Sequence, residues 1–385
     1  MAPAAPLADL DPARYALPEA DLARVLSPAL VIHLDLVRAN VRRMLAHVGT
    51  PERWRPHVKT TKTPEVFAEL LGAGLRHFKC ATLREARVLL ETARAGGHEA
   101  LDLLVAYPLL GPALGELGRL ARAYPRARLA VLCEDAHAVE AIPHEVGIFV
   151  DLDPGMRRTG IPLGERVAIH ALVRAAGTRL RGLHHYEGHL HGELEERRAQ
   201  CFACYRELLA LVAELERDGA AIPELVTSGT PAFLHALAFE PFRAGPRVHR
   251  VSPGTVVFHD ARSAEENPGL GLVPAAVVLA RVVSRPARDV VTCDAGSKSL
   301  AAEAGDPCAL VVGRPELVAL APSEEHLPLR VTAGPAPERG EVLMLVPRHV
   351  CPTVNLAEEA LLVEGGAVRG TARVRARAHD LLAGA

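Results

Sequence analysis

Short apolar runs alternate with helical patterns between residues 54 and 254 of this 385-residue chain. Intervening segments such as PEVFAELLGAG and REARVLLETARAGG repeat apolar residues at the spacing of one helix face. Strands that alternate with helices form a parallel sheet, and eight such units predict an α/β fold closed into a (β/α)8 TIM barrel. An open doubly wound sheet is the alternative. The eight runs are WRPHVK, RHFKCA, LDLLVAY, ARLAVLC, VGIFVDL, LRGLHHY, ELVTSGT and RVHRVSPG.

The pattern changes from residue 256 onward. Strand-like runs such as VPAAVVLARVVSRP, DVVTCDAGSK and EVLMLVPRHVC are separated there by turns that contain Gly, Pro and Asp. This predicts a second, mostly antiparallel β domain, which the earlier run LVIHLD could join because it precedes the eight barrel strands. We therefore predict a barrel domain over residues 36–255 and a β domain over residues 256–385 together with residues 1–35.

Charge and composition exclude several classes of partner. The chain has 44 Lys and Arg against 46 Asp and Glu, without a basic stripe, so neither nucleic acid nor an anionic membrane surface is expected. The N-terminal residues include acidic side chains and no unbroken apolar stretch, which predicts neither a signal peptide nor a membrane span. Seven scattered cysteines do not indicate a disulfide framework. We expect a cytoplasmic protein that binds a small molecule.

Lysine is rare in this chain, where arginine fills all but four of the basic positions. A lysine amine can lose its proton and attack a carbonyl, which a guanidinium cannot do. Lys59 ends the first predicted strand, where ligands bind in barrels of this kind. Lys62 is close enough in sequence to oppose protonation of Lys59, although it could equally be a solvated loop residue. Biased composition is the alternative explanation for any single lysine. The other two are Lys79 and Lys298.

Small and hydroxyl-bearing residues follow the last two predicted barrel strands. Backbone amides at such strand ends can bind a phosphate group, although SGT and PGT alone indicate only turns. The position of these tripeptides after the seventh and eighth strands favours phosphate binding. The residues are Ser228, Gly229, Thr230, Gly254 and Thr255.

His349 and Cys351 are two residues apart in PRHVCPTVN, so an extended backbone would direct both side chains to one face. An imidazole and a thiolate suit Zn²⁺, whereas Mn²⁺ or Mg²⁺ would prefer oxygen ligands. Two protein ligands leave positions open for water or substrate, which is typical of a catalytic metal. A buried cysteine beside a surface histidine is the alternative. A rival metal site of lower rank is the group His184, His185, His189 and His191.

Eight motifs resemble, in identity and order, those of the D-serine dehydratase and D-threonine aldolase family of pyridoxal-phosphate enzymes, which have the alanine racemase-like fold (fold type III). The resemblance covers nearly the whole chain from residue 28. The motifs are RPHVKTTKTPE, VDLDPGMRRTGI, GLHHYEGH, TSGTPAF, SPGTVVFHD, DAGSKSL, SEEH and PRHVCPTVNL.

The resemblance implies roles for individual residues. Lys59 would hold pyridoxal 5'-phosphate covalently and later act as a base at the substrate α-carbon. Arg158 would lie near the cofactor ring oxygen and Tyr186 would pack beside the cofactor, whereas an ion pair and a core tyrosine are the structural alternatives. The resemblance also implies a homodimer in which the β domain of one subunit closes the barrel mouth of the other.

The same resemblance implies an activity. Family members with His-x-Cys resemble the D-serine dehydratases, while D-threonine aldolases more often carry His-x-Asp. We therefore expect a Zn²⁺-dependent ammonia-lyase that converts a D-3-hydroxy amino acid into a 2-oxo acid and ammonia. One alternative is an aldolase that releases glycine and an aldehyde, and another is a non-catalytic cofactor-binding or regulatory protein. Thr61 and Val256 depart from the family pattern and leave the substrate side chain open.

Overall fold

The structure is a computed structural model that describes residues 7 and 10–384. These residues form two compact units, and the chain passes between them several times. The β unit extends to Met44 and also contains Thr60–Glu69 and Thr255–Arg377. The barrel unit contains Leu45–Lys59, Leu70–Gly254 and the C-terminal stretch from Ala378.

A parallel sheet of consecutive strands forms the centre of the barrel unit, as the sequence predicts. Seven of the eight predicted runs are strands, in the order β2-β3-β4-β5-β7-β8-β9, and a two-residue strand, β6, pairs with β5. The bounds are β2 His77–Cys80, β3 Asp102–Val105, β4 Arg128–Cys133, β5 Gly147–Asp153, β6 Ile161–Pro162, β7 Leu180–His185, β8 Glu224–Thr227 and β9 Val248–Val251.

The first predicted barrel strand is an irregular segment that joins both edges of this sheet. Trp54 forms an isolated parallel bridge with Val251 of β9, and His57 forms another with Lys79 of β2. The carbonyl of Pro56 accepts a hydrogen bond from the Lys79 N–H at 3.0 Å, but Pro56 has no N–H of its own to continue a ladder. The barrel-like closure is confirmed, and its eighth position is held by bridges rather than by a regular strand.

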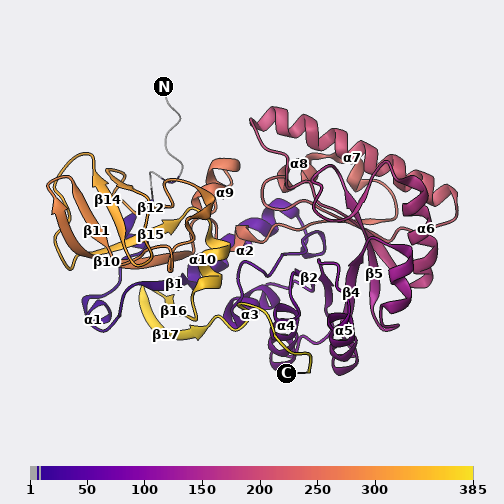
Figure 1. The fold of residues 1–385 in the computed structure, drawn as a ribbon, viewed down its shortest axis with the longest axis horizontal. Helices are drawn as coiled ribbons and strands as arrows, with labels where there is room; N and C mark the ends of the chain where they lie inside the picture. The colour runs from indigo at the N-terminus through magenta and orange to yellow at the C-terminus, as the bar shows by residue number, and fades with distance from the viewer. Residues whose placement is uncertain (1–6, 8–9, 385) are drawn as a thin grey trace. The chain divides into compact units, whose positions relative to one another are not determined.

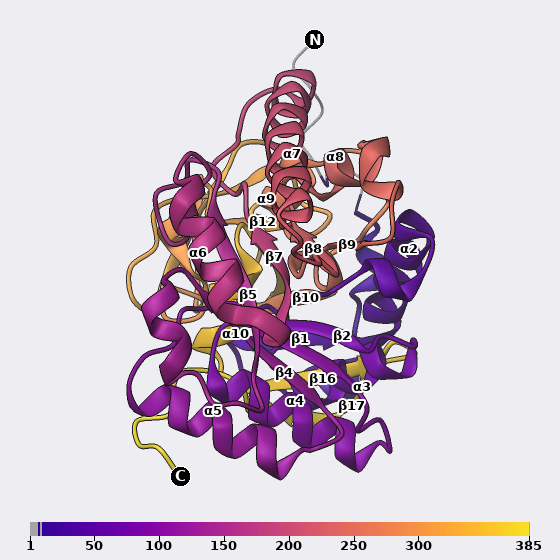
Figure 2. The ribbon, with the colours of Figure 1, turned by 90° about the vertical axis from the view of Figure 1, so that its right-hand side faces the viewer.

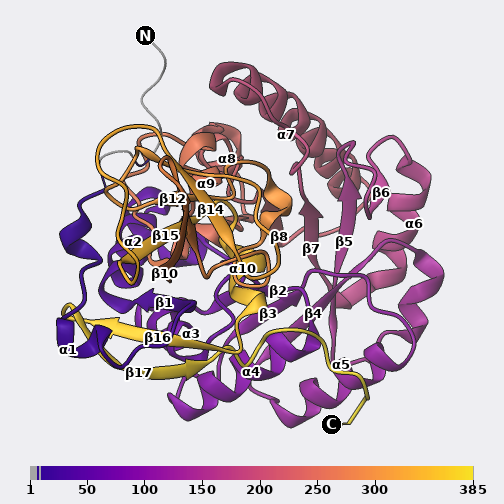
Figure 3. The same ribbon diagram turned by 60° about the vertical axis from the view of Figure 1, so that its left-hand side comes forward.

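Helices cover the outside of the parallel strands (Figures 2 and 3). The helix α7 spans 24 residues and contains both Cys201 and Cys204. None of the helices in the described part of the chain has the combined length and hydropathy that a membrane span requires. The helices of the barrel unit are α4 Leu83–Ala95, α5 Pro112–Ala123, α6 Arg166–Ala176, α7 Leu194–Arg217 and α8 Phe233–Ala238.

The β unit is built on a nine-stranded sheet in which β10 also pairs with β11, so six of its strands form a closed ring (Figure 1). The run LVIHLD contributes β1, which pairs antiparallel with β10 and parallel with β16. The predicted mostly antiparallel domain is therefore confirmed. The bounds are β1 Ala29–His33, β10 Ala276–Ala287, β11 Val290–Cys293, β12 Ala309–Val311, β13 Leu317–Ala319, β14 Leu327–Val331, β15 Val342–Pro347, β16 Glu359–Glu364 and β17 Ala367–Arg373.

Five further helices accompany the β unit. Two of them, α2 and α3, cross from the β unit into the barrel unit, so neither unit is one continuous stretch of sequence. The chain also crosses at Lys59–Thr60 and at Gly254–Thr255, directly beside predicted site residues. The helices are α1 Glu19–Leu22, α2 Leu34–Val48, α3 Pro64–Gly72, α9 Ala261–Glu266 and α10 Val350–Leu356.

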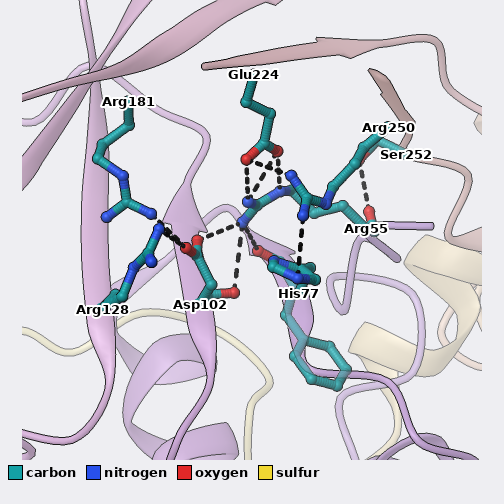
Figure 4. A network of polar contacts seen from close by, with 9 residues as sticks. Arg55, His77, Asp102, Arg128, Arg181, Glu224, Arg250 and Ser252 are labelled. Atoms are coloured by element: carbon teal, nitrogen blue, oxygen red, sulfur yellow. Dashed lines mark hydrogen bonds and ion pairs between the residues drawn. The ribbon is translucent and has the colours of Figure 1, made fainter. Parts of the chain in front are cut away.

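A buried ion network fills the amino-terminal end of the parallel strands (Figure 4). Arg55 is fully buried and binds Asp102 at 2.9 Å and Glu224 at 2.8 Å, which are the first residues of β3 and β8. Arg250 also binds Glu224, at 2.6 Å, and Arg128 binds Asp102 at 3.0 Å. Ligands of such barrels bind at the opposite, carboxyl ends of the strands, so this network is structural.

Candidate active site

The predicted site residues of the barrel unit lie at the carboxyl ends of its strands. Lys59 is exposed and ends the irregular segment that bridges to β2. Arg158 follows β5, Tyr186 follows β7 directly, and Gly254 follows β9. Since each of these residues comes after its strand, the sheet geometry brings together the residues that the sequence separates.

Tyr186 is the centre of a cationic group. The guanidinium carbon of Arg158 lies 4.9 Å from the centroid of the Tyr186 ring, and Lys79 Nζ lies 5.7 Å from it. Two cations therefore contact one aromatic ring, which attracts them through its quadrupole. A Cβ atom on Gly229 would lie 2.9 Å from the same ring, so only glycine fits there without displacement. The predicted residues Arg158, Tyr186 and Gly229 are in this way adjacent.

Lys79 contacts a buried histidine, which in turn contacts a buried aspartate. The sequence analysis did not assign these three residues to the site together. Lys79 Nζ lies 3.4 Å from His184 Nε2, and His184 Nδ1 lies 2.7 Å from Asp151. Burial and the charge of Lys79 lower the pKa of His184. Burial, then the charge of Lys59, lowers the pKa of Lys79 to about 7. The only sequence signals for this group were the rarity of lysine and its position in a strand.

The loop after β8 has a strained conformation that buried side chains hold. Ser228 has a φ of 59°, a value that residues other than glycine rarely adopt. Its N–H donates to the Glu187 carboxylate at 3.3 Å, and its hydroxyl lies 2.9 Å from that of Thr227. The Tyr205 hydroxyl donates to Glu187 as well. These buried side chains therefore hold the backbone of the predicted phosphate loop, which continues into Gly229 and Thr230.

The backbone after β9 also packs closely against another segment. A Cβ atom on Gly254 would lie 2.3 Å from the carbonyl oxygen of His57, so the backbone of the PGT turn packs directly against the segment that precedes Lys59. Glycine is required at this position for steric reasons.

His349 and Cys351 lie close together in the β unit, although not on an extended backbone. His349 has extended dihedral angles and caps helix α10, whereas Cys351 lies in the first turn of that helix. The prediction of an extended pair was wrong, since VCPTVNL forms a helix. Burial opposes the charge on His349, but hydrogen bonding and charge interaction with Cys351 raise its pKa above the ordinary value.

The Cys351 sulfur is surrounded by hydroxyl groups. It lies 3.1 Å from Thr60 Oγ1 and 3.4 Å from Thr255 Oγ1. These two threonines directly follow Lys59 and Gly254 in the chain. No group of three or more His, Cys, Asp or Glu suited to a metal occurs among the residues that the structure describes. The pair would thus offer a metal one imidazole and one thiolate. Two protein donors suit a metal that keeps open coordination positions.

The rival histidine cluster is engaged in other contacts. His184 is bonded to Asp151, and His185 lies 3.4 Å from Glu187, both of them buried. These carboxylates fix the histidines inside the barrel unit. The cluster does not form a metal site within the described residues.

The two remaining lysines have other partners, and Lys62 does not have the solvated position that the sequence left open. Lys62 is buried rather than solvated, and its Nζ donates to the Ala376 carbonyl at 3.3 Å within the β unit. Lys298 is exposed and pairs with Glu324 and Glu325, each at 2.9 Å. The lysine whose charge acts on Lys79 is Lys59.

The charges and donors of the barrel unit fit pyridoxal phosphate. An exposed amine can bond to its aldehyde, and hydroxyl groups and backbone amides at strand ends can bind its phosphate. Besides burial, two cations, Lys59 and Arg158, lower the pKa of Lys79, and a bound anion would relieve their repulsion.

Comparisons with known proteins give the family. A family model described as alanine racemase, N-terminal domain, matches residues 32–261, and one described as putative serine dehydratase domain matches residues 275–363. D-threonine aldolase of Arthrobacter sp is 33% identical over 380 residues, which cover 94% of this chain and 95% of the relative. D-threo-3-hydroxyaspartate dehydratase of Delftia sp. (strain HT23) is 29% identical over 246 residues, 61% of each chain.

The fold is shared along almost the whole chain. The solved structure of D-threonine aldolase from Filomicrobium marinum superposes with a TM-score of 0.81 at 26% identity and covers 94% of this chain and 98% of that one. A barrel-like parallel sheet followed by an antiparallel β domain is thus common to this chain and its relative.

Proposed function

We propose that this chain, which belongs to the D-serine dehydratase and D-threonine aldolase family with the alanine racemase-like fold, is a pyridoxal-phosphate-dependent lyase of D-3-hydroxy amino acids. The similarity to D-threonine aldolase over 94% of the chain supports a lyase acting on an amino acid. The exposed amine of Lys59 and the cationic group on Tyr186, both at the carboxyl ends of the strands, support the cofactor.

When bound, pyridoxal phosphate supplies an electron sink that allows a bond at the substrate α-carbon to break. Lys59 would hold it through its amine, Arg158 would bind its ring oxygen, and Tyr186 would pack beside it. Lys59 would also move the proton at the α-carbon. The residues that would bind the phosphate are Ser228, Gly229, Thr230, Gly254 and the adjoining Thr255.

We assign the metal to His349 and Cys351, and we propose Zn²⁺ because a thiolate and an imidazole are soft and borderline donors. The neighbouring hydroxyls of Thr60 and Thr255 support a polar environment for the ion. A metal there would supply Lewis acidity toward a hydroxyl oxygen, which eases its departure as hydroxide. Mn²⁺ or Mg²⁺ are the alternatives that metal analysis would distinguish.

The thiol of Cys351 is the observation that favours elimination over cleavage of the carbon skeleton. In the family pattern, members with His-x-Cys at this position resemble the D-serine dehydratases. We therefore propose loss of the β-hydroxyl and release of ammonia, with a 2-oxo acid as the product. The chain would act as a homodimer, a state that sedimentation of the purified protein would test.

A second candidate is retro-aldol cleavage to glycine and an aldehyde. The 33% identity to D-threonine aldolase and the TM-score of 0.81 to a solved enzyme of that name favour it. Lys59, the metal pair and the cofactor residues are equally compatible with both reactions, because the two differ only in which bond of the substrate breaks.

Product analysis tests both candidates. The protein, loaded with pyridoxal phosphate and Zn²⁺, is incubated with D-serine, D-threonine and both diastereomers of D-3-hydroxyaspartate, and the products are identified by mass spectrometry. A 2-oxo acid with ammonia supports the dehydratase, whereas glycine with an aldehyde supports the aldolase. Cofactor binding without either product would indicate a non-catalytic binding protein and contradict the proposal.

A further inference from the structure

Asp260 is a buried residue whose carboxylate joins the starts of two helices in the β unit. The residue is only 1% exposed. One carboxylate oxygen accepts a hydrogen bond from the N–H of Ser263 at 2.8 Å, and the other accepts from the N–H of Val350 at 3.0 Å. Ser263 lies in α9, and Val350 is the first residue of α10. The carboxylate therefore connects two segments that are 90 residues apart in the chain.

The contact of Asp260 with α10 lies between the two proposed metal ligands. Val350 separates His349 from Cys351, and its N–H belongs to the first turn of the helix, where backbone donors have no acceptor within the helix. His349 precedes this turn, but its side chain makes no capping hydrogen bond. The acceptor that a capping side chain usually supplies comes instead from Asp260, so capping does not use the imidazole.

Other contacts join the same two segments. The Arg262 N–H donates to the Arg348 carbonyl at 3.1 Å, and the Arg348 guanidinium pairs with Glu265 at 2.7 Å. The residue before His349 is thus tied to α9 through its backbone and through its side chain. Asp260 adds a buried contact on the other side of His349, so the backbone of this residue is held from both sides.

We propose that Asp260 is a positioning residue for the metal: by holding the N–H of Val350, it fixes the backbone from which the His349 imidazole and the Cys351 sulfur extend. Both Asp260 oxygens already accept hydrogen bonds, so the residue acts through the two ligands. Loss of the contacts that orient metal ligands typically costs about 10–100-fold in metal affinity. The inference rests on the metal site of the proposed function, but it does not depend on which bond of the substrate breaks.

Zn²⁺ binding to the full-length protein tests this role. Asp260→Asn keeps the shape of the side chain, but its amide has one acceptor oxygen for two N–H donors. We expect the variant to bind Zn²⁺ about tenfold more weakly in isothermal titration. Co²⁺ in place of Zn²⁺ gives a spectroscopic readout, because the absorption of Co²⁺ depends on its ligands and their geometry. We expect the Co²⁺ spectrum of Asp260→Asn to differ from that of the wild type.

Val350→Pro removes the same hydrogen bond from the donor side and keeps the charge of Asp260. Proline has no N–H and fits the first position of a helix, and His349 already has the extended angles that suit a residue before proline. We expect Zn²⁺ to bind about tenfold more weakly to this variant as well. Weaker binding in Asp260→Asn alone would show that Asp260 acts through its charge, which would overturn the inference. Val350→Pro also decides should Asp260→Asn fail to fold.

Asp294→Asn is the matched control, because the Asp294 carboxylate also joins two segments of the β unit. It accepts hydrogen bonds from the Ser27 hydroxyl at 2.5 Å and from the Arg281 N–H at 2.8 Å, and neither donor belongs to α9 or α10. Its Zn²⁺ affinity should equal that of the wild type. An equal loss of affinity in Asp294→Asn and Asp260→Asn would reveal a general effect on the β unit and overturn the inference.

The outcomes separate this inference from the proposed function. Unchanged Zn²⁺ affinity in Asp260→Asn and Val350→Pro, in a protein whose binding depends on Cys351, would overturn the inference and leave the proposed metal site intact. Zn²⁺ binding that persists in Cys351→Ala would contradict the proposed metal site and this inference together. Weaker Zn²⁺ binding in both variants of a protein that forms no product would support the inference and contradict only the proposed reaction.

Discussion

Arginine could not take the proposed role of Lys59. A guanidinium stays charged at any pH that proteins tolerate, so it cannot form a bond with an aldehyde. Lys59 has the exposed position that this proposed role needs, whereas Lys79 is buried and contacts His184. Lys298, which pairs with two exposed glutamates, has no such requirement.

Cys351→Ala tests the metal at the residue scale. The substitution would remove one of the two proposed protein ligands and its sulfur, so we expect Zn²⁺ to bind at least about tenfold more weakly. Isothermal titration with Zn²⁺ measures this affinity, and metal analysis after dialysis checks it. Activity of the loaded protein should fall in parallel.

Cys204→Ala is the matched control for this substitution. Like Cys351, Cys204 is partly exposed and forms no disulfide, but it lies in helix α7 of the barrel unit. Zn²⁺ affinity should not change in Cys204→Ala. Full metal content and activity in Cys351→Ala would remove the His349–Cys351 pair from the proposal.

At the scale of elements, the strands were predictable and the contacts between them were not. Apolar periodicity located β2 to β9 because each strand is a short buried run between turn residues. Helix α10 was missed because VCPTVNL is too short to show a helical period. Lys79, Asp151 and His184 come from three strands, so only the strand register brings them together. The sequence contains no local signal for such a group.

The carboxylate that holds the loop after β8 should make the stability of the folded protein depend on pH. Burial opposes ionisation of Glu187, but the nearby His185, 3.4 Å away, and hydrogen bonds from Tyr205 and Ser228 lower its pKa to about 2. An unfolded glutamate has a pKa of about 4.3, so the folded state gains about 3 kcal/mol above that pH and loses it as the pH falls toward 2. Glu187→Gln should be less stable than the wild type at pH 7, and urea unfolding should show this difference shrinking below about pH 4.

Tyr205→Phe should give a smaller change of the same sign, because it removes one hydrogen bond to Glu187. Tyr107→Phe is the control, since Tyr107 is 56% exposed. A stability difference between wild type and Glu187→Gln that stays constant from pH 7 to pH 2.5 would contradict the role of this carboxylate.

At the scale of the whole molecule, the chain is interleaved rather than divided at one boundary. Strand β1 lies between β10 and β16 in the sheet of the β unit, although more than 240 residues separate it from β10 in sequence. The two strands that flank β1 would lose their ladder partner in a fragment that begins at residue 256. The family models, over residues 32–261 and 275–363, likewise leave β1 partly outside both matches.

The buried ion network sets the stability of the barrel unit. Arg55 neutralises two carboxylates, those of Asp102 and Glu224, in the interior of the unit. Arg55→Met keeps a long side chain but removes the positive charge that pairs with both carboxylates. Breaking a buried pair costs about 3–5 kcal/mol, because a charge then stays buried without its partner. Urea unfolding at pH 7 should show a loss of this size.

Arg126→Met is the matched control, because Arg126 pairs with Glu99 at 3.8 Å and its side chain is 71% exposed. Exposed ion pairs contribute at most about 1 kcal/mol. Equal losses in the two variants would mean that Arg250 and Arg128 already neutralise the buried carboxylates. A large loss confined to Arg55→Met would instead show that the amino-terminal end of the strands stabilises the barrel unit, while the carboxyl ends remain free to change for chemistry.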